Sequence, residues 1–186
     1  LIELDPTAAM ADRKGVQEQQ RAATLEAGRT QALLQALRTG ARPMAAEPTA
    51  QAQLQAEWSD ILARTARFEA EARRRGAEVE TARQGLAKLQ ATLPLARQRE
   101  EDFKSLTAQG FVAGHAGQDR TRDRIEIERD LATQTARLNE AQAALAESHR
   151  AKAAYLAETQ RSLSDRHAKA TLDLAQLQQQ GAKTAQ

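Results

Sequence analysis

Histidine and carboxylate side chains are the groups in this sequence that could bind a metal ion or act as general acids and bases. His149 and His167 are 18 residues apart on one predicted helix, about five turns, so they cannot share a metal ion, and His115 falls in a predicted turn. Most carboxylates have a basic neighbour three or four residues away, which is typical of ion pairs on a helix surface. There is no cysteine, His-Glu-x-x-His run, phosphate-binding glycine loop or Gly-x-Ser-x-Gly motif. We therefore predict no catalytic residue, no metal site, no cofactor and no enzyme activity.

The composition is typical of long helices rather than of a globular core. The 186 residues are 41% hydrophobic but only 3% aromatic, and alanine supplies much of the hydrophobic share. The 27 basic and 25 acidic residues are interleaved, and the arginine run at 73–75 is flanked by glutamates. Because nucleic-acid footprints are segregated and net positive, we expect a solvated helix face there and no nucleic-acid partner. No apolar run approaches the roughly 20 residues that span a bilayer.

One hydrophobic repeat dominates the middle of the chain. Between Leu54 and Phe103, positions recur in steps of four and three for seven heptads, and only Thr65, Arg75 and Glu100 among them are not apolar. Such a repeat is a coiled-coil seam and must face another helix. The seam consists of Leu54, Trp58, Ile61, Thr65, Phe68, Ala72, Arg75, Val79, Ala82, Leu86, Leu89, Leu93, Ala96, Glu100 and Phe103.

Two further helices are predicted from weaker patterns. The third helix has leucines spaced by seven, with one four-residue stutter between Leu145 and Leu156 that locally unwinds the supercoil. The first helix has a sparser seam, and Gly15 and Gly28 weaken it. The predicted helices span 7–40, 50–108 and 118–180, joined by a proline-containing loop at 41–49 and a glycine-rich turn at 109–117. A short strand is expected at Leu1–Leu4, and Gly181 is expected to end the last helix.

The predicted fold is all-α, a long antiparallel coiled-coil hairpin with an additional N-terminal helix. The helices at 50–108 and 118–180 match in length and can pair along their whole extent. Pro94 lies inside the first of them, where we expect a bend rather than an end because the seam continues past it. The direction in which the N-terminal helix packs stays open.

The turn between the two long helices is apolar where an isolated turn should be polar. Leu106, Phe111 and Val112 cluster there. One interpretation is a local cap, in which Phe111 or Val112 folds back onto Leu106. The functional interpretation is a contact surface that enters a groove between a partner's helices.

Two segments of the chain resemble a known family. Residues 1–7, LIELDPT, resemble the strand that ends the first half of a lipoyl domain, where the chain leaves for a helical hairpin. Residues 101–106, EDFKSL, followed by 110–115, GFVAGH, resemble the hairpin tip. On these motifs the chain resembles the periplasmic adaptor, or membrane fusion protein, of type I secretion systems: the HlyD family, in its branch serving RTX toxins. In that layout, 1–6 ends a lipoyl-like half-motif and 181–186 returns toward the lipoyl-like domain.

The resemblance implies a set of tip residues and partners. Many adaptors carry Arg, Leu and Ser at the tip; here Leu106 matches, while Asp102 and Ala113 stand at the Arg and Ser positions. The tip residues implied to contact an outer-membrane channel are Leu106, Gly110, Phe111, Val112, Ala113 and His115. The implied partners are further copies in a homo-oligomeric ring (a hexamer in the full-length protein), an inner-membrane ABC transporter, a TolC-type outer-membrane channel and an exported protein substrate.

The resemblance also implies a location. We expect this chain to be a fragment, in the periplasm, of a parent protein that is anchored in the inner membrane by a segment outside it. The alternative interpretation is a cytoplasmic coiled-coil scaffold, which explains the heptads and alanines equally well. It does not explain the apolar, glycine-rich turn.

Overall fold

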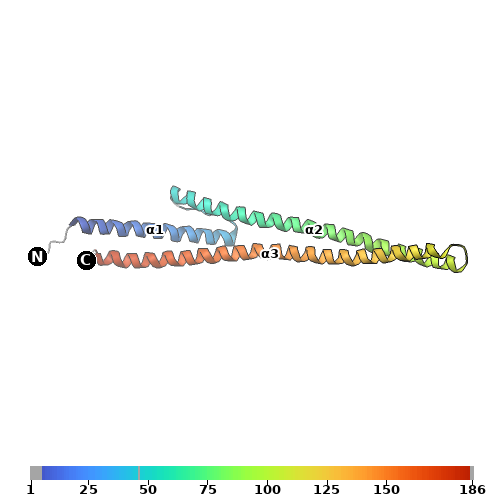
Figure 1. The fold of residues 1–186 in the computed structure, drawn as a ribbon. Coiled ribbons are helices and arrows are strands. Elements are labelled where there is room, and N and C mark those ends of the chain that lie inside the picture. Colours follow the sequence, from blue (N-terminus) through green and yellow to red (C-terminus); the bar gives the residue numbers. More distant parts are fainter. Residues whose placement is uncertain (1–5, 46, 185–186) are drawn as a thin grey trace. The chain divides into compact units, whose positions relative to one another are not determined.

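The part of the chain that the structure describes folds into three long helices (Figure 1). The computed structural model describes residues 6–45 and 47–184, with side chains at 10–45 and 47–183. The helices are α1 (Pro6–Thr39), α2 (Pro48–Ala108) and α3 (Gly114–Thr184). This described part contains no strand, which confirms the all-α class. The strand predicted at Leu1–Leu4 lies outside the described residues. None of the described helices is long and apolar enough to cross a membrane.

The residues of the α2 seam are turned away from solvent. Every one of the fifteen positions from Leu54 to Phe103 is buried or half-buried, and none is exposed. The seven-spaced residues of α3 behave in the same way: Leu131, Leu138, Leu145, Leu156, Leu163, Ala170 and Leu177. The heptad repeat therefore identified the contact faces of both helices of the hairpin.

The contacts divide the chain into two compact units. The three-helix unit comprises Leu1–Ala66 and Ala153–Gln186, and the two-helix unit comprises Arg67–Lys152. The three-helix unit has the larger apolar core. Leu33 of α1 is fully buried, as is Leu54 of α2. Around them pack Ala36, Trp58, Ile61 and Leu163.

Within the three-helix unit, α1 runs antiparallel to α3 and parallel to the start of α2 (Figure 1). Gln20 donates a hydrogen bond to the Leu177 carbonyl at 2.8 Å, whereas the Thr30 hydroxyl lies 3.2 Å from Nδ1 of His167. Residues later in α1 therefore contact residues earlier in α3, as expected for two antiparallel helices. This packing brings the first turns of α1 to the same end of the unit as the last turns of α3. The direction that the sequence left open is thereby determined.

A charged cluster joins the three helices beside this core. Arg166 of α3 contacts Glu26 of α1 at 2.8 Å and Glu57 of α2 at 3.2 Å. Arg29 of α1 contacts Glu26 and, through Nε, Glu57 at 3.1 Å. All four side chains are partly sheltered from solvent, with exposures of 23–38%. Because each charge meets an opposite charge on another helix, the cluster ties α1 to the hairpin.

The connection from α1 to α2 doubles back instead of turning tightly. Gly40 caps α1 through a hydrogen bond from its N–H to the Ala36 carbonyl at 2.8 Å. The return segment is then held by two glutamines one turn apart on α2: Gln55 donates to the Pro43 carbonyl, and Gln51 accepts from the Ala45 N–H. These side chains satisfy backbone groups that a helix or sheet would otherwise pair.

The boundaries of α3 differ most from the predicted ones. The helix α3 begins at Gly114, four residues before the expected start, and continues through Gly181 to Thr184, so the expected stop at Gly181 is wrong. A side chain at position 181 would meet Gln20 at 3.2 Å, so α1 packs directly on this turn. That packing offsets the entropic cost of a glycine. The helix α2 passes through Pro94 without a break, as predicted.

Candidate functional site

The turn between α2 and α3 is a capped, five-residue connection. The Phe111 N–H donates to the Leu106 carbonyl at 3.0 Å, and the Gly110 N–H donates to the Thr107 carbonyl at 3.0 Å. Together with the positive φ of Gly110, +80°, these bonds form a Schellman motif. A residue with a Cβ would be strained at that φ, so glycine at 110 lets α2 end sharply and fixes where the residues after it lie.

The turn presents its large apolar side chains to solvent. Phe111 is 74% exposed and Leu106 is 38% exposed, while Val112 is half-buried. Ala113 and His115 are exposed beside them. With this exposure the Phe111 ring does not fold back as a cap over Leu106, whereas a cap formed by the half-buried Val112 stays an alternative. The six residues that the resemblance implies lie in this turn or in the adjoining helix ends, and their contact with a channel stays a prediction.

A buried carboxylate lies two turns before the end of α2. Glu100 is 6% exposed, and its carboxylate accepts hydrogen bonds from the Thr121 hydroxyl at 2.8 Å and Arg124 Nε at 2.6 Å. Lys104 Nζ lies 3.1 Å away. The hydrogen bond from Thr121, then those from Lys104 and Arg124, lower the pKa of Glu100 to about 2. The carboxylate is therefore ionised at neutral pH, with donors from both helices.

Two further contacts hold α2 and α3 close to each other next to the turn. The guanidinium of Arg120 lies over the Phe103 ring, 4.8 Å from its centroid, and pairs with Asp123 at 3.3 Å. A Cβ at Gly117 would be 3.7 Å from the Thr107 hydroxyl, so α3 approaches α2 closely at that point. The cation–π contact shelters Phe103 while leaving Phe111 uncovered.

Sequence reasoning missed the partners of Glu100, although a signal was present. Thr65, Arg75 and Glu100 interrupt the apolar seam, and of these only Glu100 is buried. A charge at a buried seam position requires a partner on the facing helix. Which residue supplies it depends on the register of the two helices, which the sequence alone does not provide.

None of the three histidines joins a metal-binding group among the described residues. His115 and His149 are exposed. Nδ1 of His167 lies 3.1 Å from the Ala27 carbonyl, so this histidine links α3 to α1.

The fold and the turn define a class of protein: a long helical hairpin whose turn leaves large apolar side chains exposed. A family model described as "CyaD, alpha-helical hairpin domain" matches residues 5–186, and the chain belongs to that family. CyaD is an adaptor of type I secretion, and the resemblance drawn from the sequence is confirmed.

A solved structure has the same fold. The crystal structure of the soluble domain of LipC, a membrane fusion protein of a type I secretion system, superposes with a TM-score of 0.83. The two sequences are 14% identical over 100% of this chain and 92% of that chain. No curated protein matches the chain significantly.

Proposed function

We infer that this chain is the helical hairpin region of a periplasmic adaptor that bridges an inner-membrane ABC transporter and a TolC-type outer-membrane channel. The parent protein assembles as a ring, a hexamer by resemblance, through which an exported protein passes. The turn of the hairpin docks on the periplasmic end of the channel. Membership of the family of secretion adaptors supports this role and does not favour a cytoplasmic scaffold.

The exposed apolar turn is the observation that carries the proposal. A turn that existed only to connect two helices would gain nothing from an uncovered Phe111 and a partly uncovered Leu106. In a groove between channel helices, both side chains would leave water, and apolar burial contributes about 25 cal/mol per Å². The ordered Schellman motif means that these side chains are presented on a fixed backbone, which lowers the entropic cost of docking.

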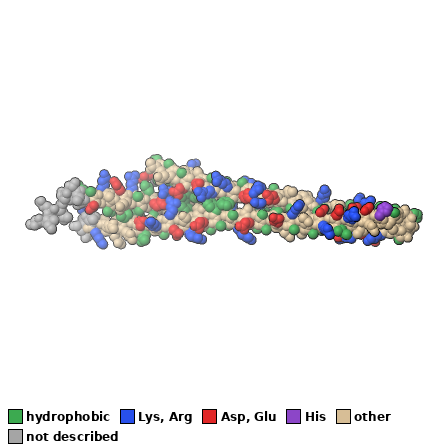
Figure 2. Space-filling model, in the orientation of Figure 1, with side chains coloured by type: hydrophobic (Ala, Val, Ile, Leu, Met, Phe, Trp, Pro, Cys, Tyr) green, Lys and Arg blue, Asp and Glu red, His purple; other side chains and the backbone are tan. Residues whose placement is uncertain are grey.

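The turn differs from the rest of the molecular surface in the kind of side chain that it exposes. Figure 2 shows acidic and basic side chains interspersed along the visible face. Exposed pairs of this kind, such as Arg74 with Glu71, contribute little to stability or binding. We therefore assign docking energy to the apolar turn, with Leu106 as its anchor.

The test is the substitution Leu106→Asp in the full-length parent protein. A carboxylate forced into an apolar groove loses its hydration without gaining a partner. We expect loss of export and of crosslinking to the channel, with helicity by circular dichroism unchanged because Leu106 is already partly exposed.

Leu95→Asp is the matched control, because Leu95 is on the same helix and 56% exposed. It is expected to preserve export. The proposal is wrong if Leu106→Asp retains wild-type export and crosslinking, or if both variants lose export equally.

A further inference from the structure

The apolar seam of the two-helix unit does not by itself define one register. The leucines of α3 at 131, 138 and 145 are spaced by seven, as are Leu86 and Leu93 of α2. Sliding α3 by one heptad would again place leucine against leucine. The helix α3 can slide in one direction only. The turn has just five residues, so a slide that shortens it by a heptad is impossible, and a slide that lengthens it remains. Something other than the leucines must exclude that slipped register.

Glu100 is the first residue that discriminates between the two registers. In the observed register it meets Thr121 and Arg124. After a slip of one heptad, the residues seven positions further along α3, Glu128 and Leu131, would face it. The buried carboxylate would then have lost both of its donors on α3, keeping only Lys104 of its own helix, and gained a like charge, which is strongly unfavourable in a sheltered site.

Gly85 and Gln134 form the second contact that distinguishes the observed register from the slipped one. The Gln134 side chain crosses the α2 backbone at Gly85 and donates a hydrogen bond to the Ala82 carbonyl at 3.0 Å. A Cβ at position 85 would lie 2.6 Å from Gln134 Nε2, so the glycine provides the space for this amide. In the slipped register Gln134 would face Leu89 and Thr92, where no glycine lies.

We propose that Glu100 and the Gly85–Gln134 pair set the register of α2 against α3, and thereby determine which residues form the turn. They are positioning residues: they touch no partner, but they keep Leu106 in the last turn of α2 and Phe111 just beyond it. The consequence for docking rests on the proposed function, whereas the register itself does not.

The test uses the 186-residue chain, whose lack of cysteine makes engineered pairs unambiguous. Spin labels at Thr81→Cys and Arg129→Cys, both exposed positions, report the axial offset of the helices by pulsed electron paramagnetic resonance. In Glu100→Leu/Gln134→Leu, neither of the two contacts that distinguish the registers can form. We expect a second distance, longer by up to about 10 Å, the rise of seven residues.

A disulfide provides an independent measurement of the same register. Thr107→Cys and Gly117→Cys are close enough to crosslink in the observed register. The crosslinking reached in a short, fixed oxidation time is expected to fall about twofold if the two registers become equally stable. Loss of stability alone would lower the melting temperature without adding a second distance.

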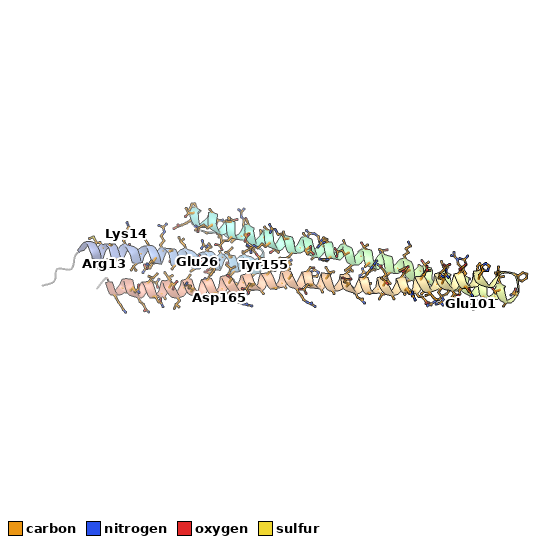
Figure 3. All side chains as sticks on the ribbon, viewed as in Figure 1. Arg13, Lys14, Glu26, Glu101, Tyr155 and Asp165 are labelled. Carbon is orange, nitrogen blue, oxygen red and sulfur yellow. The ribbon has the colours of Figure 1, made fainter. Side chains whose placement is uncertain are left out.

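The matched control is Glu101→Leu/Thr133→Leu, which makes the same kind of change at exposed neighbours and should keep one distance. Glu101 lies on α2 close to the turn (Figure 3). If the double variant loses helicity, Glu100→Leu alone carries the test and should show a smaller second population. A single native distance in folded Glu100→Leu/Gln134→Leu, with full crosslinking, overturns the proposal. Unimpaired channel docking by a slipped variant would instead contradict the proposed function.

Discussion

Glu100 shows how one polar side chain can tie two helices together near a functional turn. Its carboxylate is buried, yet three donors compensate it: a hydroxyl and a guanidinium from α3 and an ammonium from its own helix. Replacing such a buried ion pair with apolar residues is often neutral for stability, so its value lies in specificity. The sequence identified Glu100 as an exception to the seam but could not identify Thr121 and Arg124 as its partners.

The lowered pKa of Glu100 predicts a pH dependence. Its folded-state pKa, about 2, is below the ordinary 4.5, so its contribution to stability is complete above about pH 4.5 and is lost as the pH falls toward 2. The melting temperature of Glu100→Gln should therefore lie below that of the wild type at pH 7, with the gap narrowing toward pH 3. Circular dichroism melts across this range measure the gap. A gap that stays constant across the range would mean that folding does not lower the pKa of Glu100.

At the scale of elements, α2 and α3 were predictable because a heptad repeat reports which face is buried. The boundary residues were less predictable, since they depend on contacts with other elements. Gly117 lies inside α3 where it approaches Thr107, and Gly181 lies inside α3 where α1 packs. At these two glycines, contact with a neighbouring helix offsets the cost of a glycine inside a helix.

Pro94 also belongs to the scale of elements, because it affects the stability of the helix α2. It lies on the exposed side of an unbroken α2, between the buried seam residues Leu93 and Ala96. Proline removes one backbone hydrogen bond and crowds the preceding turn, so Pro94→Ala should raise the free energy of unfolding, by up to about 3 kcal/mol. Urea unfolding measures this change.

Gln98→Ala, at another exposed α2 position, is the control for that measurement and should change stability by no more than about 0.5 kcal/mol. An unchanged or lower stability for Pro94→Ala would show that α2 already accommodates the proline without cost.

At the scale of the whole molecule, the chain is divided between a three-helix unit, where α1 packs on the hairpin, and a two-helix unit that ends in the turn. The sequence predicted the helices and the turn from local patterns. It left open the direction of α1, because that depends on contacts between residues more than 130 positions apart, such as Thr30 with His167. Leu106, Phe111 and Val112 were singled out because apolar side chains at a turn are unusual, whichever way the helices pack, and their contact with a channel stays a prediction.

The most direct test of the central claim is photo-crosslinking from position 111 in the parent protein. A photoreactive phenylalanine analogue at Phe111 changes little, because that ring is 74% exposed. The same analogue at Leu172 of α3, 59% exposed, is the control. The account predicts a covalent adduct with the TolC-type channel from position 111 and none from position 172. Intact export without any adduct from position 111, or equal adducts from both positions, would contradict it.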